Sequence, residues 1–131
     1  MNASTTVLLV DDHAVVLEGY RRLLERTPDI SVVAEARNGE EAYKHFVELA
    51  PDVVVMDITL PGIGGIEVAR RMLAREPGAR IVMFSMHEDA VFSSRALQAG
   101  ARGYVTKSSA PDVLVEAVRL VAAGKLYISH D

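Results

Sequence analysis

Short runs of consecutive apolar residues alternate along this chain with segments whose apolar residues recur at the spacing of one helix face. The runs predict five strands, at residues 7–10, 30–34, 53–56, 81–84 and 103–106. Strands that are apolar at every position are typical of a parallel sheet whose two faces are both covered.

A predicted helix follows each predicted strand. The fourth helix is expected from about residue 89 to 99, and the fifth follows "SSAPD", which supplies a serine cap and a proline in the first turn. Five strand–helix units predict an α/β fold, a parallel sheet with helices on both faces and right-handed crossovers. The closing "KLYISHD" is expected to be an exit segment and not a further element. The residues that end the helices are Pro28, Pro51, Pro77, Gly100 and Gly124.

Composition narrows the possible functions. A chain of 131 residues, half of them hydrophobic, fits one domain with one core. The net charge of −4 makes it a poor nucleic-acid binder, and the lack of cysteine excludes thiol catalysis, disulfides and thiolate metal sites. The start "MNASTTV" is not a signal peptide, and no apolar run approaches the roughly 20 residues of a membrane helix. We therefore expect a soluble, cytoplasmic protein.

The polar residues that follow four of the five predicted strands form a chemical pattern. In open α/β sheets the carboxyl ends of the strands meet at one edge, where ligands bind. The second strand is followed by charged residues in no evident pattern. The other four deliver three carboxylates, a hydroxyl and an ammonium to this edge, from Asp11 and Asp12, Asp57, Ser85 and Lys107.

Each of these residues also has a structural interpretation. Asp11 or Asp12 could cap the first helix, and Asp57 could serve the turn before Pro61-Gly62. A serine cap and a solvated lysine would account for the remaining two residues. The joint pattern favours chemistry instead, because a random set of loops would rarely place acids, hydroxyl and base at one edge.

Converging carboxylates raise one another's pKa unless a cation neutralises them. Oxygen ligands without cysteine suit Mg²⁺, or Mn²⁺, better than zinc, and magnesium commonly bridges to a phosphate. Lys107 and Ser85 can hold phosphoryl oxygens. Asp57 is the natural nucleophile, because a carboxylate can accept a phosphoryl group and this one stands alone at a central strand end.

Four segments resemble the receiver domain of bacterial two-component response regulators. They are "VLLVDDHAVVLEGY", "DVVVMDITLPGIGGIEVARRM", "IVMFSMHED" and "ALQAGARGYVTKSSAPDVLVEAVRLVAAGKLYIS", which cover nearly the whole chain in the family's order. The motifs "DDHAVVLEGY", "FSMHED", "GYVTK" and "GKLYIS" are similar to those of the NarL/FixJ (LuxR-type) subfamily. The resemblance implies a flavodoxin-like receiver fold with five strands in the order 2-1-3-4-5.

The resemblance also implies roles at the strand ends. Asp57 would accept a phosphoryl group from a sensor histidine kinase. Asp11 and Asp12 would hold Mg²⁺ together with the Asp57 side chain and the backbone carbonyl of Thr59. Lys107 would contact the phosphoryl oxygens. Metal binding is expected to relieve repulsion in the pocket and to stabilise the fold.

Further residues would serve switching and tuning. Ser85 would hydrogen-bond the phosphoryl group, and Tyr104 would swing inward when Ser85 moves. Thr59, Met86 and His87 would be tuning residues. Thr59 and His87 occupy positions that tune the lifetime of the phosphate, and Met86 stands where many receivers have alanine or glycine, so that its bulk would restrict access of the phosphodonor. Ser108 stands where many receivers have proline, which leaves the isomer of the Lys107–Ser108 peptide bond open.

The output implied by the resemblance lies outside this domain. Residues 1–124 would form the receiver, and residues 125–131 would begin a linker to a C-terminal helix-turn-helix that controls transcription. Phosphorylation would shift a pre-existing equilibrium, with a homodimer as one possible consequence. The domain itself would contact neither nucleic acid nor membrane, and it would catalyse only its own phosphorylation and dephosphorylation.

Three other functions compete with the receiver. Haloacid-dehalogenase-like phosphatases also use a strand-end aspartate and Mg²⁺, but they require a second acid where this chain has Thr59. A flavin-binding flavodoxin-like domain would need a Ser/Thr/Gly-rich loop after the first strand, where "DDHAV" would repel a phosphate. An unphosphorylated interaction module would not need every reactive position filled, as it is here.

Overall fold

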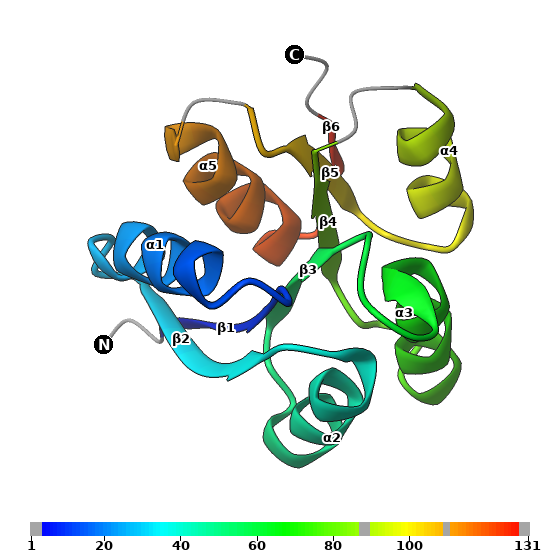
Figure 1. The fold of residues 1–131 in the computed structure, drawn as a ribbon. Coiled ribbons are helices and arrows are strands. Elements are labelled where there is room, and N and C mark those ends of the chain that lie inside the picture. Colours follow the sequence, from blue (N-terminus) through cyan, green and yellow to red (C-terminus); the bar gives the residue numbers. More distant parts are fainter. Residues whose placement is uncertain (1–3, 87–89, 109–110, 129–131) are drawn as a thin grey trace.

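A parallel sheet forms the centre of the molecule (Figure 1). The computed structural model describes residues 4–86, 90–108 and 111–128. In this part of the chain the sheet has six strands in the order β2-β1-β3-β4-β5-β6, and every neighbouring pair is parallel. The predicted order of the first five strands is therefore confirmed. The strands are β1 (Thr5–Val10), β2 (Ile30–Ala36), β3 (Val53–Asp57), β4 (Ile81–Ser85), β5 (Gly103–Thr106) and β6 (Tyr127–Ile128).

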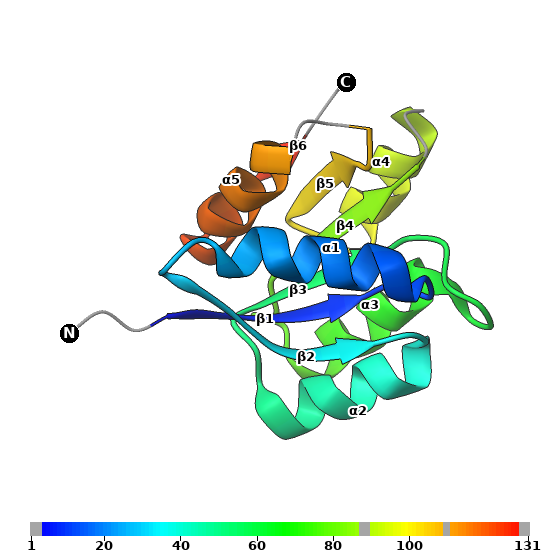
Figure 2. The ribbon, with the colours of Figure 1, turned by 60° about the vertical axis from the view of Figure 1, so that its left-hand side comes forward.

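Helices cover both faces of this sheet (Figure 2). Two hydrophobic cores, one on each face of the sheet, divide the helices into two groups. The helices α1 and α5 pack on one face, and α2, α3 and α4 pack on the other. The predicted helices are confirmed, and α4 begins within a residue or two of the expected start. The helices are α1 (Ala14–Glu25), α2 (Gly39–Leu49), α3 (Gly64–Arg75), α4 (Ala90–Gln98) and α5 (Pro111–Ala122). Of the two serines in "SSAPD" that could supply the expected cap of α5, Ser109 lies outside the described residues.

Alternation along the strands builds the two cores. In β1, Val7 and Leu9 belong to the core beneath α1 and α5, whereas Leu8 and Val10 belong to the opposite core. Successive side chains of a strand point to opposite faces, so a strand buried on both sides must be apolar throughout. This requirement is why the five apolar runs identified the strands. No described helix is both long and apolar enough to cross a lipid bilayer.

The sixth strand corrects the prediction that the chain simply exits after Gly124. Gly124 has a φ of 87°, and this left-handed conformation turns the chain back toward the sheet. Tyr127 and Ile128 then pair with Gly103 and Tyr104 of β5, and the Tyr127 N–H donates to the Arg102 carbonyl at 3.0 Å. The physical reason is that β5 would otherwise present an open row of peptide groups.

Candidate functional site: an acidic cluster with a partly buried lysine

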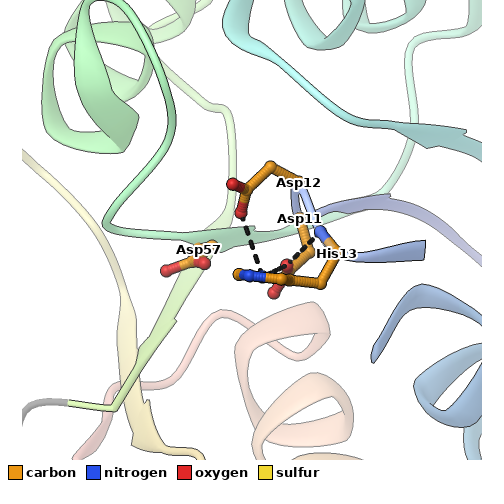
Figure 3. A group of neighbouring side chains, drawn as sticks. All are labelled: Asp11, Asp12, His13 and Asp57. Atoms are coloured by element: carbon orange, nitrogen blue, oxygen red, sulfur yellow. Dashed lines mark hydrogen bonds and ion pairs between the residues drawn. The ribbon is translucent and has the colours of Figure 1, made fainter. Parts of the chain in front are cut away.

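The carboxyl ends of β1, β3 and β5 bring the predicted site residues together. Val10 pairs with Met56, so Asp11 and Asp57 leave the sheet side by side. Asp11 is fully buried and Asp57 is 4% exposed, which is unusual for carboxylates. Figure 3 shows Asp11, Asp12 and Asp57 around one small space, with His13 beside them.

Lys107 joins two of these carboxylates from the end of β5. Its Nζ donates to Asp11 Oδ2 at 2.7 Å and to Asp57 Oδ2 at 3.0 Å. The ammonium also lies 4.9 Å from the centre of the Phe84 ring. The Lys107 backbone N–H donates to the Ser85 carbonyl at 2.7 Å, which fixes the start of the loop that carries the lysine.

Burial and pairing set the protonation of the site. Burial raises the pKa of Asp57, and the hydrogen bonds from Thr59 and Lys107 offset only part of that rise. Burial acts to lower the pKa of Lys107, but its bonds to Asp11 and Asp57 outweigh burial and leave that pKa above its ordinary value. Lys107 is therefore a fixed positive charge. The negative charge of Asp57, by contrast, is stabilised too little by its hydrogen bonds to offset the cost of its burial.

The loop after β3 holds the second oxygen of Asp57. The Thr59 N–H donates to Asp57 Oδ1 at 2.9 Å, so the side chain closes a local turn as the structural interpretation expected. The Gly65 N–H donates to the Ile58 carbonyl at 3.0 Å and packs the start of α3 against this loop. Asp57 thus serves the turn with one oxygen and faces Lys107 with the other.

Neither acid at the end of β1 caps the first helix. The N-cap of α1 is His13, and its side chain makes no capping hydrogen bond. The His13 backbone N–H instead donates to Asp11 Oδ1 at 2.9 Å. Asp12 is partly exposed, yet its Oδ1 is buried and accepts no hydrogen bond from the described residues. The simple capping interpretation of the acidic pair is therefore wrong.

The charges of this cluster suit a divalent cation. Three carboxylates and one ammonium, those of Asp11, Asp12, Asp57 and Lys107, sum to a formal charge of −2. One ligand atom from each aspartate and one from His13 all lie within 4.8 Å of one another. Oxygen-rich sites of this charge suit Mg²⁺ or Mn²⁺, and Asp12 Oδ1, which has no hydrogen bond within the described part of the chain, can serve as a ligand atom.

Comparison with known proteins agrees with this geometry. A sequence profile described as "Response regulator receiver domain" matches residues 7–119. The chain belongs to this family. The receiver domain is 47% identical over 123 residues to response regulator GacA of Pseudomonas syringae pv. syringae (strain B728a), covering 94% of this chain and 58% of GacA. It is 44% identical over 125 residues to response regulator UvrY of Escherichia coli (strain K12), covering 95% of this chain and 57% of UvrY.

A solved structure gives the same assignment. A two-component response regulator of the LuxR family from Aurantimonas sp. SI85-9A1 superposes with a TM-score of 0.94 at 50% identity, covering 97% of this chain and 91% of that one. The receiver domain spans somewhat more than half the length of the curated relatives above. Family membership favours the receiver over the phosphatase and flavodoxin alternatives.

The remaining predicted residues lie around the cluster of the receiver domain. Ser85 is the last residue of β4 and is fully buried. Tyr104 is 1% exposed, so its ring already lies inside the domain in this structure. Met86, next to Ser85, is 75% exposed. His87 lies outside the described residues. No cis peptide bond occurs in the described residues, so Lys107–Ser108 is trans.

Sequence reasoning missed two neighbours of the receiver's cluster. The His13 Nδ1 lies 3.2 Å from both Asp11 Oδ1 and Asp12 Oδ1. The Arg37 guanidinium donates to the Asp12 backbone carbonyl at 3.1 Å and ties this loop to the segment after β2. The adjacency of His13 to the acidic pair was a readable signal, whereas the Arg37 contact depends on the tertiary fold.

Proposed function

We propose that this receiver domain accepts a phosphoryl group on Asp57 from a sensor histidine kinase, in a Mg²⁺-dependent reaction, and changes conformation to control an output. The observation that carries the proposal is the excess charge of −2 around a buried Asp57 that touches Lys107. A structural ion pair would need one acid for one lysine. A site for a dication and a phosphoryl group needs the surplus acids.

The transfer needs a carboxylate nucleophile and a leaving group that can keep the electron pair of the broken bond. An Asp57 oxygen forms a bond to phosphorus as the bond from phosphorus to the kinase's histidine nitrogen breaks. The electron pair stays on that nitrogen, which takes up a proton, and Asp57 becomes an acyl phosphate. The raised pKa of Asp57 makes its ionised form a more basic nucleophile.

The neighbours of Asp57 have separable roles in this proposal. Asp11, Asp12, the Asp57 side chain and the Thr59 carbonyl would hold the metal. Bound Mg²⁺ would neutralise the excess negative charge and attract the phosphoryl oxygens. Lys107 already contacts Asp57 Oδ2, so a short movement of its ammonium would bring it to a phosphoryl oxygen.

Switching would begin at Ser85 at the end of β4 and reach Tyr104 on the neighbouring strand β5. The Ser85 carbonyl accepts from the Lys107 N–H, and Ser85 pairs with Thr106. A phosphoryl group that binds the Ser85 hydroxyl and the Lys107 ammonium would favour one arrangement of this edge over another. Tyr104 would report the change because it lies on the same short strand. Thr59, Met86 and His87 would tune the lifetime of the phosphate.

The wider assignment rests on the family. We place the receiver at residues 1–124 and the start of a linker at residues 125–131, whose Tyr127 and Ile128 pair with β5. The LuxR-family likeness supports transcriptional control through a C-terminal DNA-binding domain as the output of the whole protein. A cytoplasmic location of this protein, a sensor histidine kinase as its partner and homodimerisation on phosphorylation complete the proposal.

Intact mass spectrometry tests the chemistry. The domain would be incubated with acetyl phosphate, with and without Mg²⁺, as wild type, Asp57→Asn and the control Asp112→Asn, which alters an exposed acid of α5. We expect one added phosphoryl group in the wild type and the control, only with Mg²⁺, and none in Asp57→Asn. Failure of the wild type to take up either the phosphoryl group or beryllofluoride would leave the unphosphorylated interaction module as the function.

A further inference from the structure

The His13 ring lies against the acidic pair at the end of β1. Its Nδ1 is 3.2 Å from Asp11 Oδ1 and 3.2 Å from Asp12 Oδ1. Figure 3 shows the imidazole lying along the acidic pair, with Asp57 across the same space. Two ligand atoms that share one ion at roughly 2.1 Å, with ordinary coordination angles, lie about 3.0 to 3.4 Å apart. Both His13 distances fall inside that range.

Neither helix capping nor burial accounts for the placement of the His13 ring. The His13 side chain makes no capping bond, although the residue is the N-cap of α1. The ring is 68% exposed, so burial does not hold it against the acids. A hydrogen bond joins His13 Nδ1 to Asp11 Oδ1 at 3.2 Å, whereas Asp12 Oδ1, at the same distance from Nδ1, has no hydrogen-bond partner among the described residues.

The chemistry of the donor set then depends on the ion. Mg²⁺ prefers oxygen ligands and keeps water in the positions that the protein does not fill. Imidazole nitrogen suits later first-row ions such as Ni²⁺ and Zn²⁺, which gain a strong ligand where Mg²⁺ gains almost nothing. A histidine at this corner therefore changes the selectivity of the site more than its affinity for Mg²⁺.

We infer that His13 is a ligand for borderline divalent ions, which gives the aspartate cluster of this chain one nitrogen and shifts its preference from Mg²⁺ toward first-row transition ions. The inference rests on the metal site of the proposed function. It adds a residue to that site and names the class of ion that the residue selects. The ligand atom is Nδ1, since that nitrogen faces Asp11 and Asp12.

Isothermal titration calorimetry on tag-free protein tests the selectivity. Mg²⁺ and Ni²⁺ would be titrated into the wild type, His13→Ala and His45→Ala, the last being a matched control on α2. We expect His13→Ala to weaken Ni²⁺ binding at least about ten-fold, the lower end of what losing even an outer-shell partner costs. Mg²⁺ affinity should change by less than about two-fold, because Mg²⁺ takes oxygen ligands. His45→Ala should match the wild type for both ions.

A spectroscopic measurement on the unmutated chain makes the test independent of the variant. Pulsed electron paramagnetic resonance of Mn²⁺ bound to the wild type should show coupling to an imidazole ¹⁴N, and His13→Ala should lose it. Circular dichroism melts would verify that the variant folds, as expected for an exposed side chain.

The outcomes separate this inference from the proposed function. Equal losses of Mg²⁺ and Ni²⁺ affinity in His13→Ala would overturn the inference, because they would assign His13 a positioning role. Unchanged Ni²⁺ affinity together with no ¹⁴N coupling would also overturn it, while leaving an aspartate-only site intact. If the wild type binds neither ion, the metal site of the proposed function fails as well, whatever the phosphorylation assay gives.

Discussion

Gly65 allows α3 to approach the phosphoacceptor strand, and replacing it should damage both stability and phosphorylation. The residue is buried in the first turn of α3. A Cβ built there overlaps the Asp57 carbonyl oxygen and lies 3.0 Å from Ile58 Cα. Both neighbours are backbone atoms, so no side-chain rotation can relieve the overlap.

The size of the effect follows from the overlap. Ordinary contact requires the β3 backbone and the start of α3 to separate by about 1 Å. Overpacking of this kind costs about 1–3 kcal/mol, which for a domain of this size lowers the melting temperature by roughly 4–12 °C. A displacement of about 1 Å at a reacting group costs on the order of 100-fold in rate. Gly65→Ala should therefore be destabilised and phosphorylated about 100-fold more slowly.

Two assays on one pair of variants test this reasoning. Thermal melts by circular dichroism would measure stability, and intact mass against time with acetyl phosphate would measure the rate. Gly78→Ala is the control, because a Cβ there meets nothing within 4 Å. Wild-type stability and rate in Gly65→Ala would refute the claim that the glycine positions Asp57. Lost stability with an unchanged rate would refute the catalytic half alone.

Three further predictions concern the charges of the site. Lys107→Met leaves buried Asp11 and Asp57 without their ammonium and should lower the free energy of unfolding by about 3–5 kcal/mol. Urea melts measure this loss, and saturating Mg²⁺ should restore part of it. A loss no larger than in the exposed control Lys125→Met would contradict the pairing. The pKa of Asp57 is raised above 3.8 by burial, so the folded state holds this proton more tightly than the unfolded state, and the contribution of Asp57 to stability falls as pH rises from about 4 through the folded pKa. Metal-free Asp57→Asn should therefore gain stability relative to the wild type across that window, whereas parallel urea midpoints at every pH would be inconsistent with the raised pKa. Burial raises the pKa of the Tyr20 phenol, and Lys107 opposes that rise. Phenolate absorbance, assigned with Tyr20→Phe, should therefore show a still higher Tyr20 pKa in Lys107→Met. A lower Tyr20 pKa in that variant would show that the ammonium does not act on Tyr20.

Local patterns predicted the elements because burial on both faces leaves an unambiguous signature. The runs around Val7–Val10 and Val53–Met56 are apolar at every position, as strands between two helical layers must be. Their carboxyl ends predicted the site because parallel strands end at one edge. Tyr127 and Ile128 gave no comparable signal, since a strand of two residues is defined by the neighbouring edge of β5 and not by its own sequence.

The contacts of the site depended on tertiary geometry. Lys107 was predicted to meet a phosphoryl group, but its simultaneous bonds to Asp11 and Asp57 require knowing how three strand ends converge. The 75% exposure of Met86 could likewise not be read from its place after an apolar run. The direction of a side chain at a strand end depends on the loop that follows, and sequence patterns carry little information about loops.

The adjacent carboxylates at the end of β1 are tolerated because Asp11 and Asp12 lie in different surroundings. Asp11 is fully buried, and its charge is balanced within the protein by Lys107 and by the His13 N–H. Asp12 is partly exposed, and its buried Oδ1 has no hydrogen bond from any residue that the structure describes. Repulsion between the two is therefore compensated on one side before any metal binds. The expectation that a metal alone makes the pair tolerable is too simple, because Lys107 accounts for one of the three negative charges and leaves a dication the other two.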